Sequence, residues 1–452
     1  MKHTRVVRSA VMKALPCAAL LLSFVVRPAA AQVDRRPDQA EGGAAADLGT
    51  LIEEALANNP ALKAVAARLQ AARSLPSQAQ APPDPEVSLS YLNDGVSEFT
   101  LGESEFSTLS LTWTQEVPYP GKLRGAGDVA TQEIERASRE LDGARLEVAS
   151  TVKSAYADLY RLDRTSAILE ETKAILDSLA QAARRRYEVG QGIQENVLKA
   201  QTEILRVEAE LLRVAQDRRV AEARLNAAVG RSAGIPIGLA MTLPEGALPP
   251  NPEALADIAV DASPEIASLA AAVRRQEAGV HLARLELKPD FIWSASYQNR
   301  GGLDPMVAAM FGVRLPLHRE RKQSQALLQA DSELLAARHE LSNRQLQTRA
   351  SVTELVSRVE IAERLVLLYE HGVIPQARGA LESAQASYGV GRIAFLDLLN
   401  DLTVLLDARI ELASQESDRL QSLAALEPLV ALELVRAPRA TEDRGGPDGI
   451  HH

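Results

Sequence analysis

Four short segments of the chain alternate apolar and polar residues with a period of two. They cover residues 86–93 and 107–116 in the first half and residues 290–299 and 306–315 in the second. This alternation predicts strands with one apolar and one polar face. Each segment is near the length of about 9 to 11 residues that a tilted strand needs to cross a bilayer. The pattern leaves two interpretations open: membrane-spanning strands, or two hairpins packed on helices.

Two much longer segments predict long helices. Residues 121–187 and residues 317–374 contain no proline. Apolar residues recur at the heptad spacing of helices that pack nearly parallel, as in the series Leu162, Leu169 and Leu176. At 1.5 Å per residue, a helix over residues 121–187 would be about 100 Å long. We expect a second helix of similar length over residues 317–388, with Pro375 as its candidate kink.

The sequence contains an internal two-fold repeat. Residues 187–190 recur 201 positions later as residues 388–391, with the shared pattern Tyr-x-Val-Gly. Glycine suits the end of a helix because it tolerates the left-handed backbone conformation. After each copy the pattern predicts a shorter returning helix, over residues 195–229 and 395–426. The strand pairs keep the same order in both halves, so each half reads as helix, two strands, long helix and shorter helix.

These signals divide the chain into six parts. Residues 230–252 are rich in Gly and Pro, which is typical of a linker. The predicted parts are a signal peptide (1–31), an N-terminal linker (32–47), a first structural repeat (48–229), a linker (230–252), a second structural repeat (253–435) and a disordered tail (436–452).

The N-terminus is typical of a cleavable export signal. A basic start is followed by an apolar stretch over residues 14–26 and by three alanines at residues 29–31. The single cysteine, Cys17, lies in that stretch, so the mature protein would have neither a thiol nor a disulfide. The signal carries five positive charges and no acidic residue, so cleavage would change the net charge from −10 to about −15.

Composition favours packed helices over an enzyme core. Hydrophobic residues make up 46% of the chain but aromatic residues only 4%, although aromatics supply much of the buried area in compact cores. The excess of acidic over basic residues disfavours nucleic acid as a partner. Beyond the N-terminus no uncharged apolar run reaches the roughly 18 residues of a membrane helix.

If the strands span a bilayer, several chains must share one barrel. Unpaired backbone groups in lipid cost several kcal/mol each, and the smallest common membrane barrels have about eight strands. Three chains with four strands each would give 12 strands, which leaves an aqueous bore. The long helices would extend that bore on one side of the membrane, and the assembly would be a duct.

The sequence resembles the TolC family of outer-membrane efflux proteins over about residues 48–434. The resemblance rests on Asn-Pro-Ala-Leu at residues 59–62, on the strand pairs after Pro-Asp at residues 83–84 and 289–290, and on the two Tyr-x-Val-Gly segments. It implies a mainly α fold with a membrane β-barrel: a long antiparallel α-helical periplasmic tunnel, with four strands per chain in a 12-stranded barrel of a homotrimer.

The same resemblance implies partners and a passive role. The duct would sit in outer-membrane lipid and receive substrate from a periplasmic adaptor and an inner-membrane pump of the RND type. Residues 115–122 (Gln-Glu-Val-Pro-Tyr-Pro-Gly-Lys) are similar to a segment of the heavy-metal branch, the CzcC and CusC type. Metal cations are therefore the first expected cargo. Export of drugs or other organic compounds, and type I protein secretion, are the alternatives.

The resemblance also implies which residues dock and gate. The two helix-turn tips would contact the adaptor. The tip residues are Tyr187, Val189, Gly190 and Gly192 in the first repeat, and Tyr388, Val390, Gly391 and Arg392 in the second. The candidate gate residues are Glu195, Asn196, Asp397 and Asn400. Asp397 matches an acidic gating position of the family. Asn196 and Asn400 stand where other members have Asp, and Arg392 and Glu195 are the candidates to replace the family's ion pairs. The alternative is that Asp397 and Glu195 are solvated helix-start residues favoured by the helix dipole.

No pattern of an enzyme is present in the sequence. The histidines are scattered, and no pair lies three or four residues apart on a predicted helix. We therefore expect no catalytic activity, no cofactor and no resident metal. A soluble periplasmic coiled-coil scaffold is the competing interpretation of a different class.

Overall fold

The computed structural model describes residues 47–436. The predicted signal peptide, most of the N-terminal linker and the predicted tail beyond Arg436 lie outside the described residues. The helices, in chain order, are α1 (Leu48–Asn58), α2 (Pro60–Arg73), α3 (Leu75–Gln80), α4 (Lys122–Glu188), α5 (Gln194–Val229), a 3₁₀ turn (Pro252–Ala254), α6 (Leu255–Ala262), α7 (Pro264–Leu285), α8 (Gln323–Leu368), a π turn (Tyr369–Val373), α9 (Ile374–Gly389) and α10 (Phe395–Val430).

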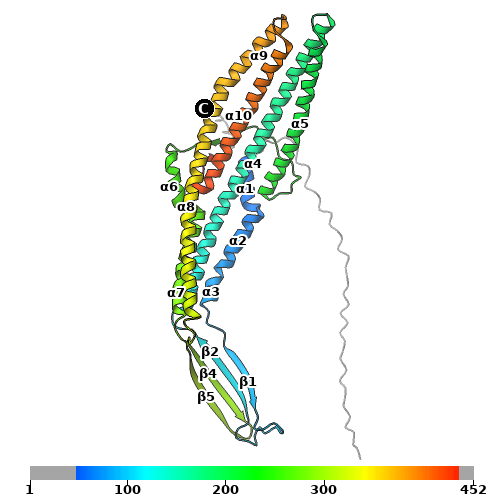
Figure 1. Cartoon of the computed structure of the whole chain (residues 1–452). Helices are drawn as coiled ribbons and strands as arrows, with labels where there is room; N and C mark the ends of the chain where they lie inside the picture. The colour runs from blue at the N-terminus through cyan, green and yellow to red at the C-terminus, as the bar shows by residue number, and fades with distance from the viewer. Residues whose placement is uncertain (1–46, 437–452) are drawn as a thin grey trace, which may run out of the picture. The chain divides into compact units, whose positions relative to one another are not determined.

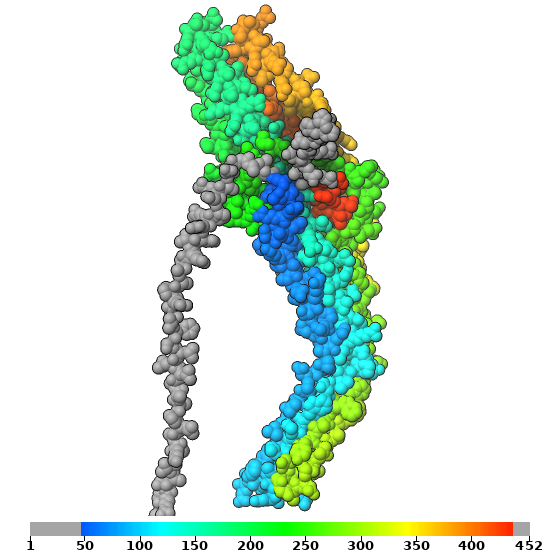
Figure 2. Space-filling model, turned by 180° about the vertical axis from the view of Figure 1, so that it is seen from behind, coloured from blue at the N-terminus to red at the C-terminus, as the bar shows by residue number. Residues whose placement is uncertain are grey.

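Helix α4 packs against six other helices, whereas α8 and α9 pack against α10 (Figure 1). Its 67 residues follow Gly121, whose left-handed backbone (φ 100°) turns the chain out of the preceding strand. Toward the tips, α4 packs against α5 and α10, and α10 packs against α9. Toward the strands, it packs against α7 and against α1, α2 and α3, which run along it as one track (Figure 2). None of the described helices is long and apolar enough to cross a membrane.

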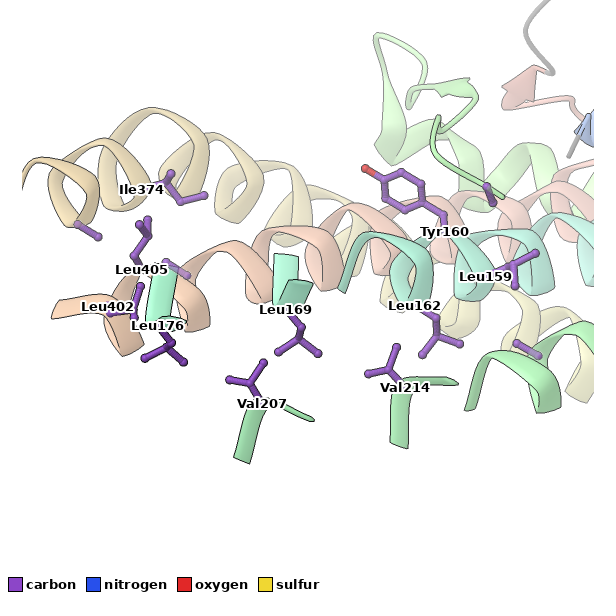
Figure 3. Packing of buried hydrophobic residues seen from close by; sticks show 14 of the residues in the cluster. Leu159, Tyr160, Leu162, Leu169, Leu176, Val207, Val214, Ile374, Leu402 and Leu405 are labelled. Carbon is purple, nitrogen blue, oxygen red and sulfur yellow. The ribbon is translucent and has the colours of Figure 1, made fainter. Parts of the chain in front are cut away.

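The core consists of narrow seams between these helices (Figure 3). Leu162 and Leu169 of α4 face Val214 and Val207 of α5, and all four side chains are at most 7% exposed. The heptad spacing keeps the same stripe of α4 against its neighbours along much of its length. Full burial of one such side chain stabilises the fold by about 1.5–3 kcal/mol. Many small contributions along a line therefore replace one large core.

The second long helix differs from the prediction at its start, whereas its distal end at Gly389 and the irregularity near Pro375 agree with it. The helix begins at Gln323 rather than at residue 317, because residues 317–322 form hydrogen-bonded turns. Near its distal end the π turn Tyr369–Val373 precedes α9, where Pro375 occupies the first turn. Proline cannot donate the usual helical hydrogen bond and clashes with the carbonyl four residues before it, and a π turn absorbs this with a local change of register.

The last helix also runs beyond its predicted end. α10 continues four residues past residue 426, to Val430, although it contains Pro428. Buried Leu426 and Val430 belong to a cluster with Leu255 of α6 and Val435. Tertiary packing therefore extends the helix across a residue that would end it in isolation.

The strands form one antiparallel sheet in the order β1-β2-β4-β5 (Figure 1). Their bounds are β1 (Glu86–Leu92), β2 (Thr108–Val117), β4 (Asp290–Arg300) and β5 (Leu303–Arg314). β5 begins three residues before its predicted start because the β4–β5 turn is tight. Gly301 in that turn has φ 70°, and a Cβ there would lie 2.4 Å from the Cα of Gly102. Only glycine fits this position.

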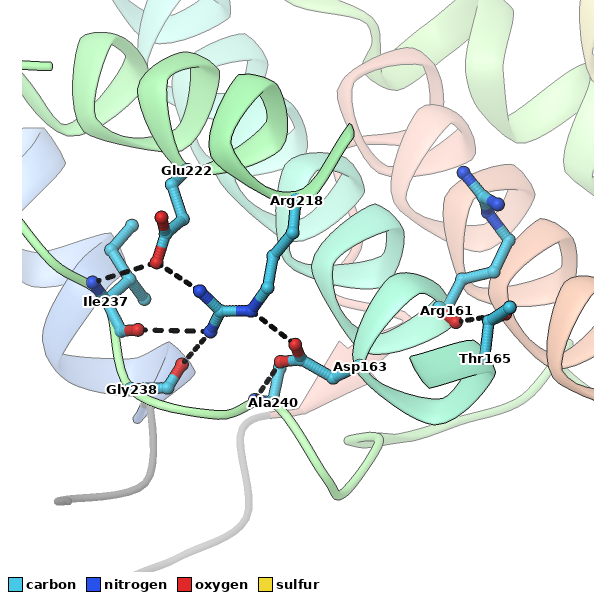
Figure 4. A network of polar contacts seen from close by, with 8 residues as sticks. All are labelled: Arg161, Asp163, Thr165, Arg218, Glu222, Ile237, Gly238 and Ala240. Carbon is cyan, nitrogen blue, oxygen red and sulfur yellow. Dashed lines mark hydrogen bonds and ion pairs between the residues drawn. The ribbon is translucent and has the colours of Figure 1, made fainter. Parts of the chain in front are cut away.

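The predicted linker over residues 230–252 is ordered (Figure 4). The guanidinium of Arg218 lies 2.5 Å from Asp163 and donates to the carbonyls of Ile237 and Gly238 at 3.2 and 3.4 Å. The other oxygen of Asp163 accepts the amide of Ala240 at 2.8 Å. Strand β3 (Glu245–Gly246) then pairs with β6 (Val435–Arg436), so the predicted tail begins inside a strand rather than in disorder.

Candidate functional site

The two helix-turn tips lie at the end of the helices opposite the sheet (Figure 1). α4 passes into α5 at the first tip, and α9 passes into α10 at the second. Gly190 (φ 72°) and Gly391 (φ 76°) have left-handed backbones, a conformation that is costly for other residues. Val189 and Val390 beside them are 67% and 70% exposed. Each tip thus presents one valine to solvent.

The backbone of the two tips closes in the same way. The amide of Gln191 donates to the carbonyl of Arg186 at 2.8 Å, and the amide of Arg392 donates to the carbonyl of Ser387 at 2.9 Å. The first turn is also tight at Gly192, where a Cβ would lie 3.2 Å from the Cβ of Arg186. The repeated sequence pattern therefore gives a repeated turn.

The tyrosines of the two tips have different environments. Tyr187 is 47% exposed, whereas Tyr388 is 7% exposed and its ring lies 5.3 Å from that of Phe395. The Arg186 guanidinium lies 4.9 Å from the centre of the Tyr388 ring and donates to the Tyr388 carbonyl. Burial raises the pKa of the Tyr388 phenol, although the Arg186 charge and a hydrogen bond with Asn196 oppose this shift. Arg186 thus ties the first tip to the second.

Two of the candidate gate residues have local partners at helix starts. Asp397 accepts the amide of Ala394 at 3.3 Å, as a residue of a capping box does. Glu195 forms an ion pair with Lys199 at 2.7 Å, one turn further along α5. Within residues 47–436, Arg392 forms no ion pair, so the structure does not bring it together with Glu195. These contacts match the helix-start interpretation of Asp397 and Glu195.

The two candidate asparagines also differ. Asn196 opposes the rise in the pKa of Tyr388 on the other tip, whereas Asn400 is exposed on the first turns of α10. Sequence reasoning missed the role of Arg186, because its partner is about 200 residues away and no local pattern marks a contact between an arginine and a ring.

The sheet is the second exposed feature. Directly paired residues share a face, and the register joins Val87 to Trp113, Trp113 to Ala295, and Ala295 to Ala309. One face is therefore apolar across all four strands, and several of its side chains are half exposed or more: Val87, Leu89, Leu111, Trp293, Val307 and Phe311. The other face carries Ser, Thr and Gln at most positions of β1, β2 and β4.

The sheet has two open edges, at β1 and β5. Neither edge strand has a second partner strand within the described part of the chain. The same part contains no cluster of three or more His, Cys, Asp or Glu residues suited to a metal ion.

The family model described as "Outer membrane efflux protein" matches residues 51–231 and 255–431. The chain belongs to this family, whose members are outer-membrane channels rather than enzymes.

Individual relatives agree with this assignment. The outer membrane efflux protein BepC of Brucella suis biovar 1 is 26% identical over 272 residues, which cover 59% of each protein. The structure resembles that of VceC from Vibrio cholerae (TM-score 0.73, 23% identity, 85% of this chain and 96% of that one). It also resembles a structure of CusC (TM-score 0.73, 15% identity, 87% and 95%). The chain spans about three fifths of the length of its curated relative, and at these identities the solved structures establish the fold alone.

Proposed function

We propose that the chain is the outer-membrane duct of a tripartite efflux system. Three copies would form a 12-stranded barrel in outer-membrane lipid and a helical tunnel in the periplasm. The duct would conduct substrate passively, and an inner-membrane pump of the RND type would supply the energy through a periplasmic adaptor. The observation that carries the proposal is the four-stranded sheet with one exposed apolar face and two open edges.

A sheet of this kind is unfavourable alone in either solvent. In water its apolar face would be a large exposed patch, which soluble monomers rarely tolerate. In lipid its open edges would leave backbone groups unpaired at several kcal/mol each. Closure with further copies solves both problems, because β5 of one copy can pair with β1 of the next while the apolar face meets lipid.

The helical layer supports the same assembly. In the tip half, α9, α10, α4 and α5 lie side by side in that order, so α5 and α9 form its two edges (Figure 1). The outer side of α5 carries Leu198, Leu205 and Leu212, which are 54%, 64% and 74% exposed. They lie opposite the stripe that α5 buries against α4. A helix with apolar stripes on both sides is suited to neighbours on both sides.

The outer side of α9 and the π turn complements these leucines. Its small residues follow the same heptad spacing: Gly372, Gly379 and Ala386. A Cβ on Gly379 would meet nothing within 4 Å, so no contact within residues 47–436 explains a glycine that costs the helix about 1 kcal/mol relative to alanine. Counted from the tips, the small residues lie level with the leucines, each pair about 10.5 Å beyond the last. Leucines of one copy would fill the space beside small residues of the next.

The tips are proposed as the adaptor-docking end. Exposed Val189 and Val390 offer apolar contacts at equivalent places on two neighbouring hairpins. The gate is proposed at the start of the returning helices, at Glu195, Asn196, Asp397 and Asn400. The contacts of Arg186 with the ring and the carbonyl of Tyr388 support a closed arrangement in which one hairpin holds the other.

We infer that metal cations are the first cargo to test, ahead of drugs and secreted proteins. The support is the similarity of residues 115–122 to the heavy-metal branch. In the structure these residues form the joint between β2 and α4: the Tyr119 amide donates to Asp290 at 2.8 Å, and buried Lys122 lies 3.1 Å from Glu286 and 2.9 Å from Asp290. The segment is thus bound to Glu286 and Asp290 of the same chain, so the similarity bears on kinship and not on selection of cargo.

The deciding experiment measures mass and conductance of the purified protein. We expect extraction only with detergent, a particle of about three times the mass of the mature chain, and ion conductance in planar bilayers. A monodisperse monomer that is soluble without detergent would sink the proposal and support the periplasmic scaffold. Deletion in cells then separates the cargo classes: metal accumulation favours cations, drug accumulation favours organic compounds, and loss of a secreted protein favours type I secretion.

A further inference from the structure

The turn between β5 and α8 differs from its counterpart in the first repeat. After β2 the chain enters α4 within five residues, and Lys122 is buried in an ion pair. After β5 it instead makes a turn over residues 315–322, closed by backbone hydrogen bonds such as that from the Lys322 amide to the His318 carbonyl at 3.0 Å. This turn is the loop Leu-Pro-Leu-His-Arg-Glu-Arg-Lys, which we call the basic turn.

The basic turn presents cations that the protein itself does not neutralise. Arg319, Arg321 and Lys322 are exposed, and none of them forms an ion pair within the described residues. Glu320 between them is also exposed and likewise forms none, so the turn has three cationic side chains against one carboxylate. Lys288, just after the end of α7, is also exposed and forms no ion pair within the described residues. This contrasts with Arg314, which pairs with Glu116 just before the turn. Although the chain has an excess of acidic residues, unpaired cationic side chains thus lie together where β5 and α7 end.

The same turn exposes apolar side chains beside these cations. Leu315 is 60% exposed and Leu317 is 83% exposed. Together with Lys288, His318 and Lys322 they line a groove whose wall on α7 includes Leu282. The acidic groups in the groove are engaged: Glu116 by Arg314, and Glu286 and Asp290 by Lys122. The groove therefore offers free positive charge and apolar surface, and its anionic groups are already paired.

We propose that the basic turn binds the phosphate groups of anionic phospholipids in the periplasmic leaflet of the outer membrane. The inference rests on the proposed function, which places the sheet in lipid. The turn directly continues the apolar face of β5, so it would lie where the bilayer ends. Cations beside a membrane attract anionic headgroups, and leucines beside them can contact the first part of the acyl chains. A soluble phosphate compound would use the cations but not the leucines.

The test measures lipid binding to the full-length protein purified in detergent. Native mass spectrometry would count phosphatidylglycerol and phosphatidylcholine molecules on the trimer. The variant Arg319→Gln/Arg321→Gln/Lys322→Gln removes the cations of the turn. The matched control, Lys63→Gln/Arg68→Gln/Arg73→Gln, removes three exposed cations of α2 that also lack ion pairs within the described residues. A second variant, Leu317→Ser, removes an apolar contact and no charge.

We expect the wild-type protein and the α2 control to retain phosphatidylglycerol over phosphatidylcholine. The triple variant of the turn should bind phosphatidylglycerol at least tenfold more weakly, since each cation near an anionic surface changes binding about fivefold. Leu317→Ser should bind it more weakly than wild type. Unchanged binding in the triple variant would overturn the proposal, and so would full displacement of the lipid by inorganic phosphate with no effect of Leu317→Ser. Both results would concern trimers of unchanged mass, whereas failure of the proposed function would show as the absence of a trimer.

Discussion

At the scale of single residues, a buried ion pair holds the end of the described chain. The Nζ of Lys153 lies 2.7 Å from Glu427 and donates to the carbonyl of Val435 at 2.9 Å. Glu427 also accepts the amides of Leu434 and Val435 at 2.9 and 2.8 Å. Both charged side chains are 5% exposed. The pair thus joins α4, α10 and strand β6, and through β6 it holds β3 of the linker.

Removal of one partner should be costly. In Lys153→Met, Glu427 would keep a buried charge without its counter-charge, so we expect the apparent free energy of unfolding to fall by about 3–5 kcal/mol. The measurement is chemical unfolding of the purified protein followed by circular dichroism. Lys153→Met/Glu427→Gln should recover more than half of the loss, because glutamine is neutral and still offers an acceptor to the two amides.

Breaking an exposed ion pair provides the control for the loss of stability expected in Lys153→Met. Arg206→Met breaks the ion pair of Arg206 with Glu203 at 3.1 Å, in which the arginine side chain is 74% exposed. It should cost at most about 1 kcal/mol. If Lys153→Met cost no more than Arg206→Met, the buried pair would have no special role.

Residues of the tips show which details a sequence can predict. Gly190 and Gly391 were predicted at turns, and both have positive φ. A glycine that follows a long helical pattern is a local signal for the end of the helix, so the turn can be predicted from the sequence. The contact of Arg186 with Tyr388 depends on how two hairpins meet and has no local signature. The bond of Asp397 with the Ala394 amide is local, and a helix-start role of Asp397 was one of the two predicted alternatives.

At the scale of elements, the heptad pattern predicted α4 well because residues 121–187 contain no proline that would interrupt the helix. The helix spans Lys122–Glu188, close to the predicted residues 121–187. The second long helix was less predictable. Its start is set by the basic turn, and the π turn lies just before Pro375, where a kink was predicted. The turn before α8 and the π turn both depend on which backbone amide donates to which carbonyl. The spacing of apolar residues does not determine that choice.

The proposed seam between copies makes a prediction at this scale. Gly379→Leu would place a leucine where Leu205 of the next copy should lie. The substitution favours the helix itself, so the fold of the single chain should be kept while the trimer dissociates at lower denaturant or temperature. Leu205→Ala/Gly379→Leu moves the large side chain across the seam and should restore much of the trimer stability. Native mass spectrometry and crosslinking would quantify the trimer.

The control for the seam is Ala380→Leu. Ala380 is exposed on α9 and lies about 100° around the helix from Gly379. It should leave the trimer unchanged. Equal effects of Gly379→Leu and Ala380→Leu, or no rescue by the double variant, would show that the leucine stripe of α5 does not meet the small residues of α9.

At the scale of the whole molecule, the sheet end and the tip end of the structure would have separable tasks. The sheet and the helix edges are proposed to build the trimer, whereas the tips are proposed to meet the adaptor. The family resemblance of the sequence implies this division, whereas apolar periodicity alone does not, because assembly and docking are properties of several chains. Its structural support is the position of the apolar sheet face, the edge stripes and the exposed valines.

Gly391→Leu tests this division. Its backbone has φ 76°, and a Cβ would lie 3.1 Å from the Arg186 guanidinium, so leucine would strain the turn and displace Arg186 from Tyr388. We expect trimer mass and conductance to persist, whereas adaptor capture and efflux in cells are lost. Gly279→Leu on α7, where φ is not positive and the nearest atom is 3.7 Å away, should keep all four properties. A dissociated Gly391→Leu trimer would place the second tip among the assembly contacts instead, because a docking surface can be lost without loss of the duct.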